Sequence, residues 1–209
     1  MTWKFEWIAF DTETTGFGPK ARIVSIALAL FQRGELVSTQ LEHFNPEPID
    51  WGSADVRHAM SVNKLSPAFL RGKPKLRNRW PTLLRGFAQS RVWVAHNAPF
   101  DLAMLRAERE RVDRETGSSS QQLVPRALVL DTIGLDCLIN PDAGSRALEA
   151  VCSRWGVRLV NGHRADADAI ACGRLLAAMA PRLSDDPREV RDQMRAAQQA
   201  WKEKRRHER

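Results

Sequence analysis

Two carboxylates stand two residues apart in the N-terminal part of the chain, where Thr12 separates Asp11 from Glu13. On an extended chain, residues i and i+2 point to the same face of the strand. Two like charges held side by side cost free energy unless a cation lies between them, and carboxylate oxygens are ligands that suit Mg²⁺ and Mn²⁺. The pair is therefore a candidate metal site. The alternative is a polar turn, because Thr-Thr-Gly follows at residues 14–16.

A third carboxylate, Asp168, lies in a helix predicted over residues 165–180. At about 100° per residue, Asp168 falls in the middle of the apolar stripe of this helix, whereas Asp166 falls on the polar side. An acid directed at the core needs a partner, because burying an unpaired carboxylate is very costly. Asp168 is therefore a candidate metal ligand, with a salt bridge to an arginine as the alternative, and Asp166 is expected to be solvated.

Two further residues could take part in the same chemistry. Asp101 ends the string His-Asn-Ala-Pro-Phe-Asp at residues 96–101, where a predicted strand gives way to a helix. An acid in the first turn complements the helix dipole, so Asp101 taken by itself is better explained as a capping residue. His163 stands five residues before Asp168 and could act as a base, or be only a surface or capping residue.

The three motifs together resemble the DEDDh 3′–5′ exonucleases over about residues 5–180. This superfamily includes the proofreading subunit of the bacterial replicative polymerase, RNase T and oligoribonuclease. The motifs are Phe-Asp-Thr-Glu-Thr-Thr-Gly at residues 10–16, the string at residues 96–101, and His163 before Asp168, in the family order. The sister group has Tyr where this chain has Arg164, and the chain contains no Tyr. The resemblance implies a general base, His163, and two divalent cations, Mg²⁺ or Mn²⁺, with four ligands: Asp11, Glu13, Asp101 and Asp168.

The resemblance also implies an activity and a class of partner. We expect a metal-dependent 3′–5′ exonuclease that releases nucleoside monophosphates from single-stranded nucleic acid with a free 3′ end, with DNA favoured over RNA. Proofreading, repair and processing roles would all fit this activity, with a DNA polymerase or another replication or repair protein as partner. One alternative is an RNA-trimming exoribonuclease. The other is a non-catalytic nucleic-acid-binding or polymerase-associated module, which would be expected to lack one of the carboxylates.

Substrate contacts follow from the same resemblance. Thr14 and Thr15 are expected to contact the terminal nucleotide, and His96 and Asn97 of the second motif are expected to bind substrate. In related enzymes an apolar residue of the segment that matches residues 58–61 wedges against the terminal base. Here that segment reads His-Ala-Met-Ser, which makes Met60 the candidate wedge, with a core methionine as the alternative.

The positive charge is concentrated in one stretch. The formal net charge is +7, and residues 57–91 contain nine Lys or Arg and no Asp or Glu. Such a field attracts polyanions. Within residues 71–79 a cation stands at every second position, and we expect three of them to follow the backbone of single-stranded nucleic acid, with Trp80 as a stacking platform. The alternative is a solvated loop. The three cations are Lys73, Lys75 and Arg77.

The elements that must hold these residues form an α/β pattern. With 209 residues and 43% apolar content, the chain can bury a single core. The pattern predicts strands over 3–10, 22–31, 36–44, 91–95 and 127–130, and helices over 99–111, from 145, over 165–180 and from 187. Asp131 is expected to cap a helix. The resemblance implies a ribonuclease H-like five-stranded mixed sheet flanked by helices. The expected domains are an exonuclease domain over 1–181 and a basic C-terminal helix over 182–209.

The remaining composition argues against a membrane or secreted protein. The longest apolar run is about half the roughly 20 residues that a membrane helix needs, and the N-terminus has no signal-peptide pattern. We therefore expect a cytoplasmic protein that does not bind membranes. Its three cysteines are an odd number without metal-ligand spacing, which predicts buried free thiols: Cys137, Cys152 and Cys172.

Overall fold

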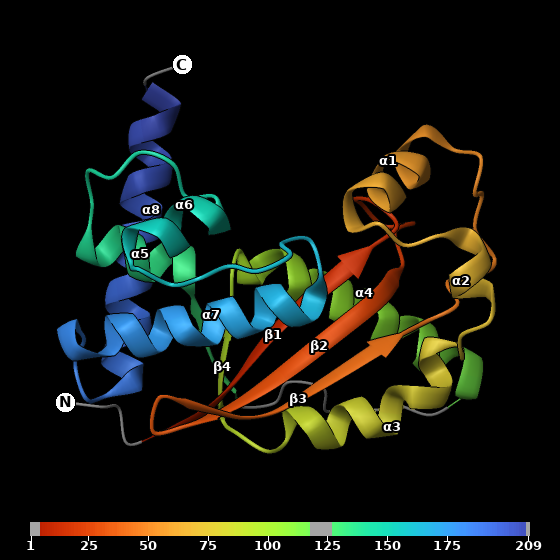
Figure 1. The fold of residues 1–209 in the computed structure, drawn as a ribbon, viewed down its shortest axis with the longest axis horizontal. Coiled ribbons are helices and arrows are strands. Elements are labelled where there is room, and N and C mark those ends of the chain that lie inside the picture. Colours follow the sequence, from red (N-terminus) through yellow and green to blue (C-terminus); the bar gives the residue numbers. More distant parts are fainter. Residues whose placement is uncertain (1–4, 118–126, 208–209) are drawn as a thin grey trace.

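The computed structural model describes residues 5–117 and 127–207, and its centre is one five-stranded mixed sheet in the order β3-β2-β1-β4-β5 (Figure 1). The first three strands pair antiparallel, and β4 and β5 continue the sheet parallel to β1. This confirms the predicted five-stranded mixed sheet. The strands are β1 (Glu6–Thr14), β2 (Ile23–Gln32), β3 (Glu35–His43), β4 (Val92–Ala95) and β5 (Leu128–Asp131).

A tight hairpin joins β2 to β3. Gln32 and Glu35 pair across the two strands, and Arg33 and Gly34 between them both have positive φ, at 53° and 88°. Two consecutive residues of this kind match the right-handed twist of the strands that they connect. The hairpin therefore fixes which residues of β3 lie beside β2.

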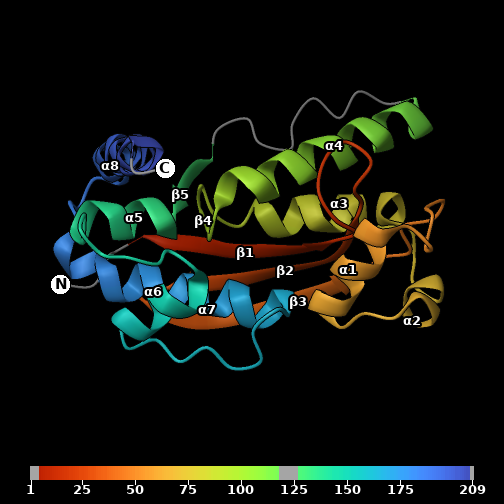
Figure 2. The ribbon, with the colours of Figure 1, turned by 90° about the horizontal axis from the view of Figure 1, so that it is seen from above.

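The two faces of β1 are covered by different helices (Figure 2). Trp7 and Ala9 belong to the core cluster that contains α7 (Ala165–Met179), whereas Ile8 and Phe10 pack with residues of α3 (Leu76–Phe87) and α4 (Ala98–Thr116). Because side chains alternate along a strand, the odd-numbered residues continue onto the α7 face. The carboxylates that follow at positions 11 and 13 are thereby directed toward α7.

A glycine lets α7 lie close to the sheet. A Cβ atom at Gly173 would be only 2.1 Å from Cε2 of Phe31 on β2. Any larger residue would push this helix away from the strands. The close approach matters because the first turn of the same helix carries Asp168.

The remaining helices lie around this central unit (Figure 1). Helices α1 (Ala54–Asn63) and α2 (Pro67–Arg71) lie beyond the C-terminal end of β1 (Figure 1). The last helix, α8 (Pro187–His207), packs against α5 (Thr132–Ile139) and β5. Val190 and Met194 of that last helix join the same core cluster as α7. The division at residue 181 stays a prediction. The elements are α1 (Ala54–Asn63), α2 (Pro67–Arg71), α5 (Thr132–Ile139), α6 (Leu148–Arg154), the 3₁₀ turn Ala180–Arg182 and α8 (Pro187–His207).

Several element boundaries differ from the prediction. The first strand continues to Thr14, so the carboxylate pair lies within the strand and not in a turn. The helix predicted from Ser145 begins at Leu148, because Ser145 Oγ accepts a hydrogen bond from the Ala147 backbone in the loop before it. Residues 3–4 of the first predicted strand lie outside the described residues.

Two predictions on composition can be compared with the structure. All three cysteines are buried and free, as expected. None of the helices in the described ranges is long and apolar enough to cross a membrane.

Candidate active site

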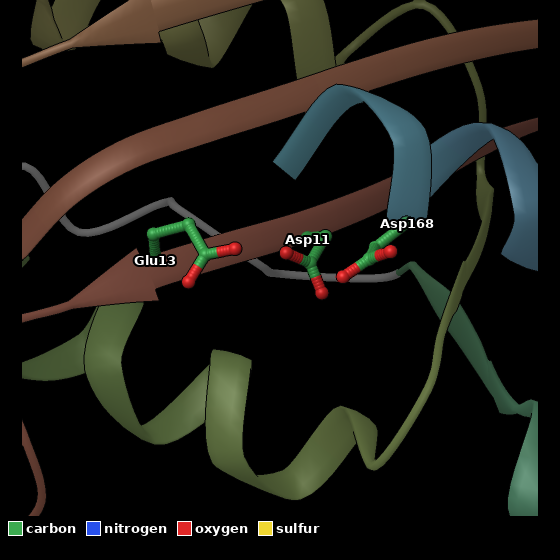
Figure 3. Close-up of side chains that lie close together, drawn as sticks. All are labelled: Asp11, Glu13 and Asp168. Atoms are coloured by element: carbon green, nitrogen blue, oxygen red, sulfur yellow. The ribbon is translucent and has the colours of Figure 1, made fainter. Parts of the chain in front are cut away.

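Three carboxylates, which we call the acidic cluster, meet between β1 and the start of α7: Asp11, Glu13 and Asp168 (Figure 3). Each offers one oxygen, and these oxygens all lie within 4.8 Å of one another. Asp11 and Glu13 reach this point because they share one face of β1, and Asp168 because it is on the buried side of α7. The structure thus brings together residues from the first and third motifs.

Asp168 is a buried member of the acidic cluster. Its side chain is 9% exposed, and its Oδ1 atom is buried without a hydrogen-bond partner among the described residues. Its Oδ2 atom accepts a hydrogen bond of 3.1 Å from the backbone N–H of His163. The alternative, a salt bridge from Asp168 to an arginine, is not found in the described part of the chain; the nearby Arg164 pairs instead with Asp166, at 3.0 Å.

The electrostatics of the acidic cluster disfavour negative charge. Burial raises the pKa of Asp11 well above its ordinary value, and the charges of neighbouring carboxylates raise it further. Burial, followed by the charge of Asp168, raises the pKa of Glu13 to about 7. Burial also raises the pKa of Asp168. Hard carboxylate oxygens, mutual repulsion and an orphaned buried oxygen are what a divalent-cation site presents, so these residues fit such an ion.

Asp101 lies next to the acidic cluster but is held differently. It is 2% exposed in the first turn of α4, and its Oδ1 atom accepts hydrogen bonds from the backbone and hydroxyl of Thr12, at 3.0 and 2.6 Å. Burial raises the pKa of Asp101 to about 7 although both hydrogen bonds lower it. Its charge contributes to the raised pKa of Asp11, so the two carboxylates interact. Its role as a fourth ligand stays a prediction.

His163 stands at the entrance of α7 with an exposed side chain. Its backbone has a φ of 65°, in the left-handed region, and its N–H is the group that binds Asp168. The backbone of His163 is therefore tied to the acidic cluster while its imidazole is accessible to solvent. Its role as general base stays a prediction.

A hollow of about 340 Å³, which we call the Phe17 hollow, opens beside Glu13 between the end of β1, α1 and the start of α4. Phe17 is 84% exposed, and its ring contacts that of Phe100 edge to face, with 5.6 Å between the ring centroids. Val62 of α1 adds a further apolar side chain. The motifs in the sequence do not include Phe17, Val62 or Phe100; the signal for the hollow is the aromatic residue directly after the Thr-Thr-Gly string.

The predicted contacts to the terminal nucleotide divide into two groups. Thr14 lines the Phe17 hollow, whereas the Thr15 hydroxyl is buried and accepts a hydrogen bond from the Arg22 backbone. Met60 is buried with Val24 and Leu70 in a small core cluster. The prediction of Met60 as a wedge is therefore wrong for this structure, because its side chain packs against the sheet and does not line the hollow.

His96 and Asn97 brace the turn before α4. His96 Nδ1 forms a 2.8 Å hydrogen bond with the Thr132 hydroxyl, and burial lowers the pKa of this histidine. Asn97 has a φ of 63°, and its backbone N–H donates to Asp131. Asp131 also accepts from the backbone of Ile133, which confirms it as the cap of α5. These contacts fix the direction in which α4, and hence Asp101, leaves the sheet.

The basic segment, residues 71–79, is largely paired with acids from elsewhere in the chain. The ion pairs are Arg71–Glu47 at 3.0 Å, Arg77–Glu115 at 2.7 Å and Arg79–Glu42 at 2.7 Å. Lys73 lies over the Phe69 ring, and Lys75 precedes α3. Trp80 is only 3% exposed and packs in the core, so the prediction that it is a stacking platform is wrong.

Comparison with known sequences identifies relatives over most of the chain. The model of the exonuclease family RNase_T matches residues 8–176. The PolC-type DNA polymerase III of Halalkalibacterium halodurans is 26% identical over 173 residues, which are 82% of this chain and 11% of that protein. The corresponding protein of Streptococcus suis is 29% identical over 175 residues, 81% of this chain and 11% of that protein. The chain thus spans about a tenth of the length of these relatives.

Solved structures show the same fold. Exonuclease X, determined in complex with 5′-overhanging duplex DNA, superposes with a TM-score of 0.66 at 20% identity, over 90% of this chain and 99% of that one. A structure of exonuclease I superposes with a TM-score of 0.68 at 16% identity, over 90% of this chain and 42% of that one. The predicted ribonuclease H-like architecture is thereby confirmed.

Proposed function

The chain belongs to the RNase_T exonuclease family of DEDD 3′–5′ exonucleases, which are phosphodiester hydrolases, and from this premise we propose its substrate and mechanism. The substrate is single-stranded nucleic acid with a free 3′ end, DNA in preference to RNA, and the product is a nucleoside monophosphate. The observation that carries this proposal is the acidic cluster, whose charge no Lys or Arg compensates in the described part of the chain. It opens beside a hollow lined by aromatic side chains.

Different residues of the chain would bind the metal ions and transfer the proton during hydrolysis. Asp11, Glu13 and Asp168, with Asp101 as the fourth ligand, would hold two divalent cations, Mg²⁺ or Mn²⁺. When bound, such cations lower the pKa of the attacking water and offset the charge that develops on the phosphodiester. His163 would take the proton of this water as general base.

The Phe17 hollow would receive the base of the terminal nucleotide. The exposed ring of Phe17 offers a face on which any base can stack, and Phe100 closes the corner behind it. Asn63 Nδ2 donates to the backbone carbonyl of Thr14 at 3.3 Å, which holds α1 to the end of β1 and so fixes the width of the hollow. Stacking of this kind is tolerant of sequence, as an exonuclease requires.

A DNA polymerase, or another replication or repair protein, is the partner class that we propose. This rests on the similarity to one tenth of the PolC-type polymerases. Binding of a purified polymerase by the wild-type chain and by a variant with the exposed α8 residues Arg188, Arg195 and Lys202 changed to Gln would test whether α8 makes the contact. Equal binding of both forms would remove α8 from this role.

The activity is tested with 5′-labelled single-stranded DNA and RNA oligonucleotides of equal sequence, incubated with Mg²⁺, Mn²⁺ or EDTA and resolved on a denaturing gel. We expect a metal-dependent ladder that shortens from the 3′ end, faster on DNA. Asp168→Asn should abolish the ladder, whereas the matched control Asp185→Asn, at an exposed position, should not. Faster RNA cleavage would favour the exoribonuclease alternative. Binding without shortening of either polymer would favour the non-catalytic module.

A further inference from the structure

A second hollow lies on the other side of Glu13 from the Phe17 hollow. It measures about 380 Å³ and lies over β2 and β3, between the end of α1 and the start of α7. Glu13 and Asn63 line both hollows, so the two open on either side of the same carboxylate. We call the second one the Ser25 hollow; its wall includes Ser25, Leu41, His43, Lys64 and Arg164.

A polar row runs along the floor of the Ser25 hollow. Glu13 on β1 pairs with Ser25 on β2, and Ser25 pairs with His43 on β3, so the three side chains share one face of the sheet. Ser25 is 1% exposed, and its Oγ atom has no hydrogen-bond partner among the described residues. The Nδ1 atom of His43 is likewise buried and unpartnered there. Unpartnered polar atoms at such depth are costly, which points to a ligand that would satisfy them.

The two hollows differ in charge. No Lys or Arg lines the Phe17 hollow within the described ranges, whereas Lys64 and Arg164 line the Ser25 hollow. Arg164 is paired with Asp166. Lys64 is exposed and has no ion pair in the described part of the chain, so its charge is available to an anion. Only the Ser25 hollow therefore offers a free cation to a phosphate.

The chemistry of 3′-end hydrolysis indicates which nucleotide of the substrate each hollow would bind. Water adds to the last phosphodiester, the bond from phosphorus to the 3′ oxygen of the penultimate nucleotide breaks, and that oxygen takes up a proton from solvent. The terminal nucleotide leaves as a 5′-monophosphate, so its only phosphate is the one at the acidic cluster. The penultimate nucleotide carries a further 5′-phosphate, which needs a cation of its own.

We infer that the Ser25 hollow binds the penultimate nucleotide of the substrate. Lys64 receives its 5′-phosphate, and Ser25 and His43 hydrogen-bond its sugar or base. This inference rests on the proposed function and deepens it, because it assigns the two nucleotides on either side of the cleaved bond to separate hollows. It also makes Ser25 a binding residue and not a catalytic one.

The test compares two substrates that differ only in the leaving group. One is a single-stranded oligonucleotide, and the other is the p-nitrophenyl ester of thymidine 5′-monophosphate, which has no penultimate nucleotide. Ser25→Ala and Lys64→Asn should each raise KM for the oligonucleotide about tenfold, the size expected for a lost hydrogen bond to a charged or buried group, and leave kcat/KM for the ester within twofold. Asn is chosen because Lys64 has a φ of 57°.

Matched controls use exposed residues of the same types. Ser38→Ala on β3 and Lys20→Asn remove the same groups away from both hollows and should change neither substrate. Ser25→Ala should also leave the thermal unfolding midpoint unchanged or raised, because its hydroxyl has no partner to lose. An unchanged oligonucleotide KM, or an equal loss on both substrates, overturns the assignment.

Failure of the proposed function gives a different result. If the wild-type protein cleaves neither substrate, the exonuclease proposal fails, and the hollow is then judged by equilibrium binding of a dinucleotide and of a mononucleotide 5′-phosphate. Weaker binding of the dinucleotide alone by the Ser25 and Lys64 variants supports the assignment. Equal affinities of wild type and variants for the dinucleotide contradict it.

Discussion

Two groups of buried carboxylates in this protein differ in their charged partners: one group is paired with arginines and the other is not paired with Lys or Arg in the described part of the chain. Asp136 on α5 is fully buried and forms ion pairs with Arg146 and Arg154. It also accepts a 2.9 Å hydrogen bond from the indole of Trp155. Asp168 is almost as buried, yet its Oδ1 atom has no hydrogen-bond partner among the described residues, and the charged groups that act on its pKa there are His163 and Asp166.

The difference shows what a structural carboxylate looks like in this fold. Glu108 repeats the first pattern, with Arg22 and Arg111 both 2.9 Å from its Oε1 atom. Two buried acids at separate places in the fold, Asp136 and Glu108, are thus each held by two arginines. Within residues 5–117 and 127–207 the acidic cluster pairs with no arginine, which leaves its compensation to a cation from outside the chain.

The largest effect is expected from Asp11→Asn, which removes one charge from the acidic cluster at constant shape. Loss of a metal ligand forfeits several kcal/mol of transition-state stabilisation, so the exonuclease rate should fall about 10³-fold or more. Repulsion within the acidic cluster falls at the same time, so thermal unfolding in EDTA should move to higher temperature. If Asp11→Asn kept the wild-type rate, or were less stable than wild type in EDTA, the acidic cluster would have a structural role like that of Asp136.

His163→Ala separates the base from the ligands. The rate should fall by roughly 10²- to 10⁴-fold because proton transfer is lost. Mn²⁺ affinity by calorimetry should stay close to wild type, because only the backbone of His163 contacts Asp168. His163→Asn, which tolerates the positive φ, should lose the same activity. A variant with wild-type turnover would reject the assignment of His163 as base.

Asp136→Asn tests the carboxylate that is paired with arginines. It leaves the buried Arg146 without its counter-charge, so the free energy of unfolding should fall by about 3–5 kcal/mol. Denaturant titration measures this, and the rate per folded molecule should remain that of wild type. A large loss of rate at unchanged stability would assign Asp136 to the site and break the distinction between the two groups.

The pH dependence of stability should follow the acidic cluster. The folded pKa values of Glu13 and Asp101 are raised to about 7, so between their ordinary values and pH 7 the folded state binds more protons than the unfolded state. The free energy of unfolding in EDTA should therefore fall as the pH rises through this window, with about 2–4 °C in the unfolding midpoint for each kcal/mol. Saturating Mg²⁺ should reverse the trend. A midpoint in EDTA that rises with pH would contradict the raised pKa values.

The smallest effect is expected in the basic segment. Replacing Lys73, Lys75 and Arg77 together by Gln should flatten the salt dependence of oligonucleotide binding, by about 2 in the logarithmic slope rather than 3. The reason is that Arg77 is already paired with Glu115. Fluorescence anisotropy over a range of salt concentrations measures the slope. An unchanged slope would remove these cations from the substrate path.

The sequence predicted the sheet and the acidic residues for one reason: both depend on local patterns. Alternation along β1 placed Asp11 and Glu13 on one face, and helical periodicity placed Asp168 toward the core. The wrong predictions concern side chains whose partners are distant. Trp80 and Met60 pack in cores that the chain pattern did not resolve, and both were expected to contact substrate.

The basic segment illustrates the same limit. Residues 57–91 contain no acid, so a count along the chain describes them as a strong positive field. In the folded protein three arginines of this stretch meet Glu42, Glu47 and Glu115, which belong to other elements. Charge patterns in sequence do not contain these pairings.

The sequence by itself determined the class of fold, the three motifs and the residue types that could bind a divalent cation, because periodicity and spacing act within a few residues. The tertiary structure alone decided which buried acids receive an arginine and which do not. It also placed Ser25 and His43 beside Glu13, through the register of three strands. Pairing across a sheet or between helices joins residues far apart in the chain, and only packing of the whole domain selects among those partners.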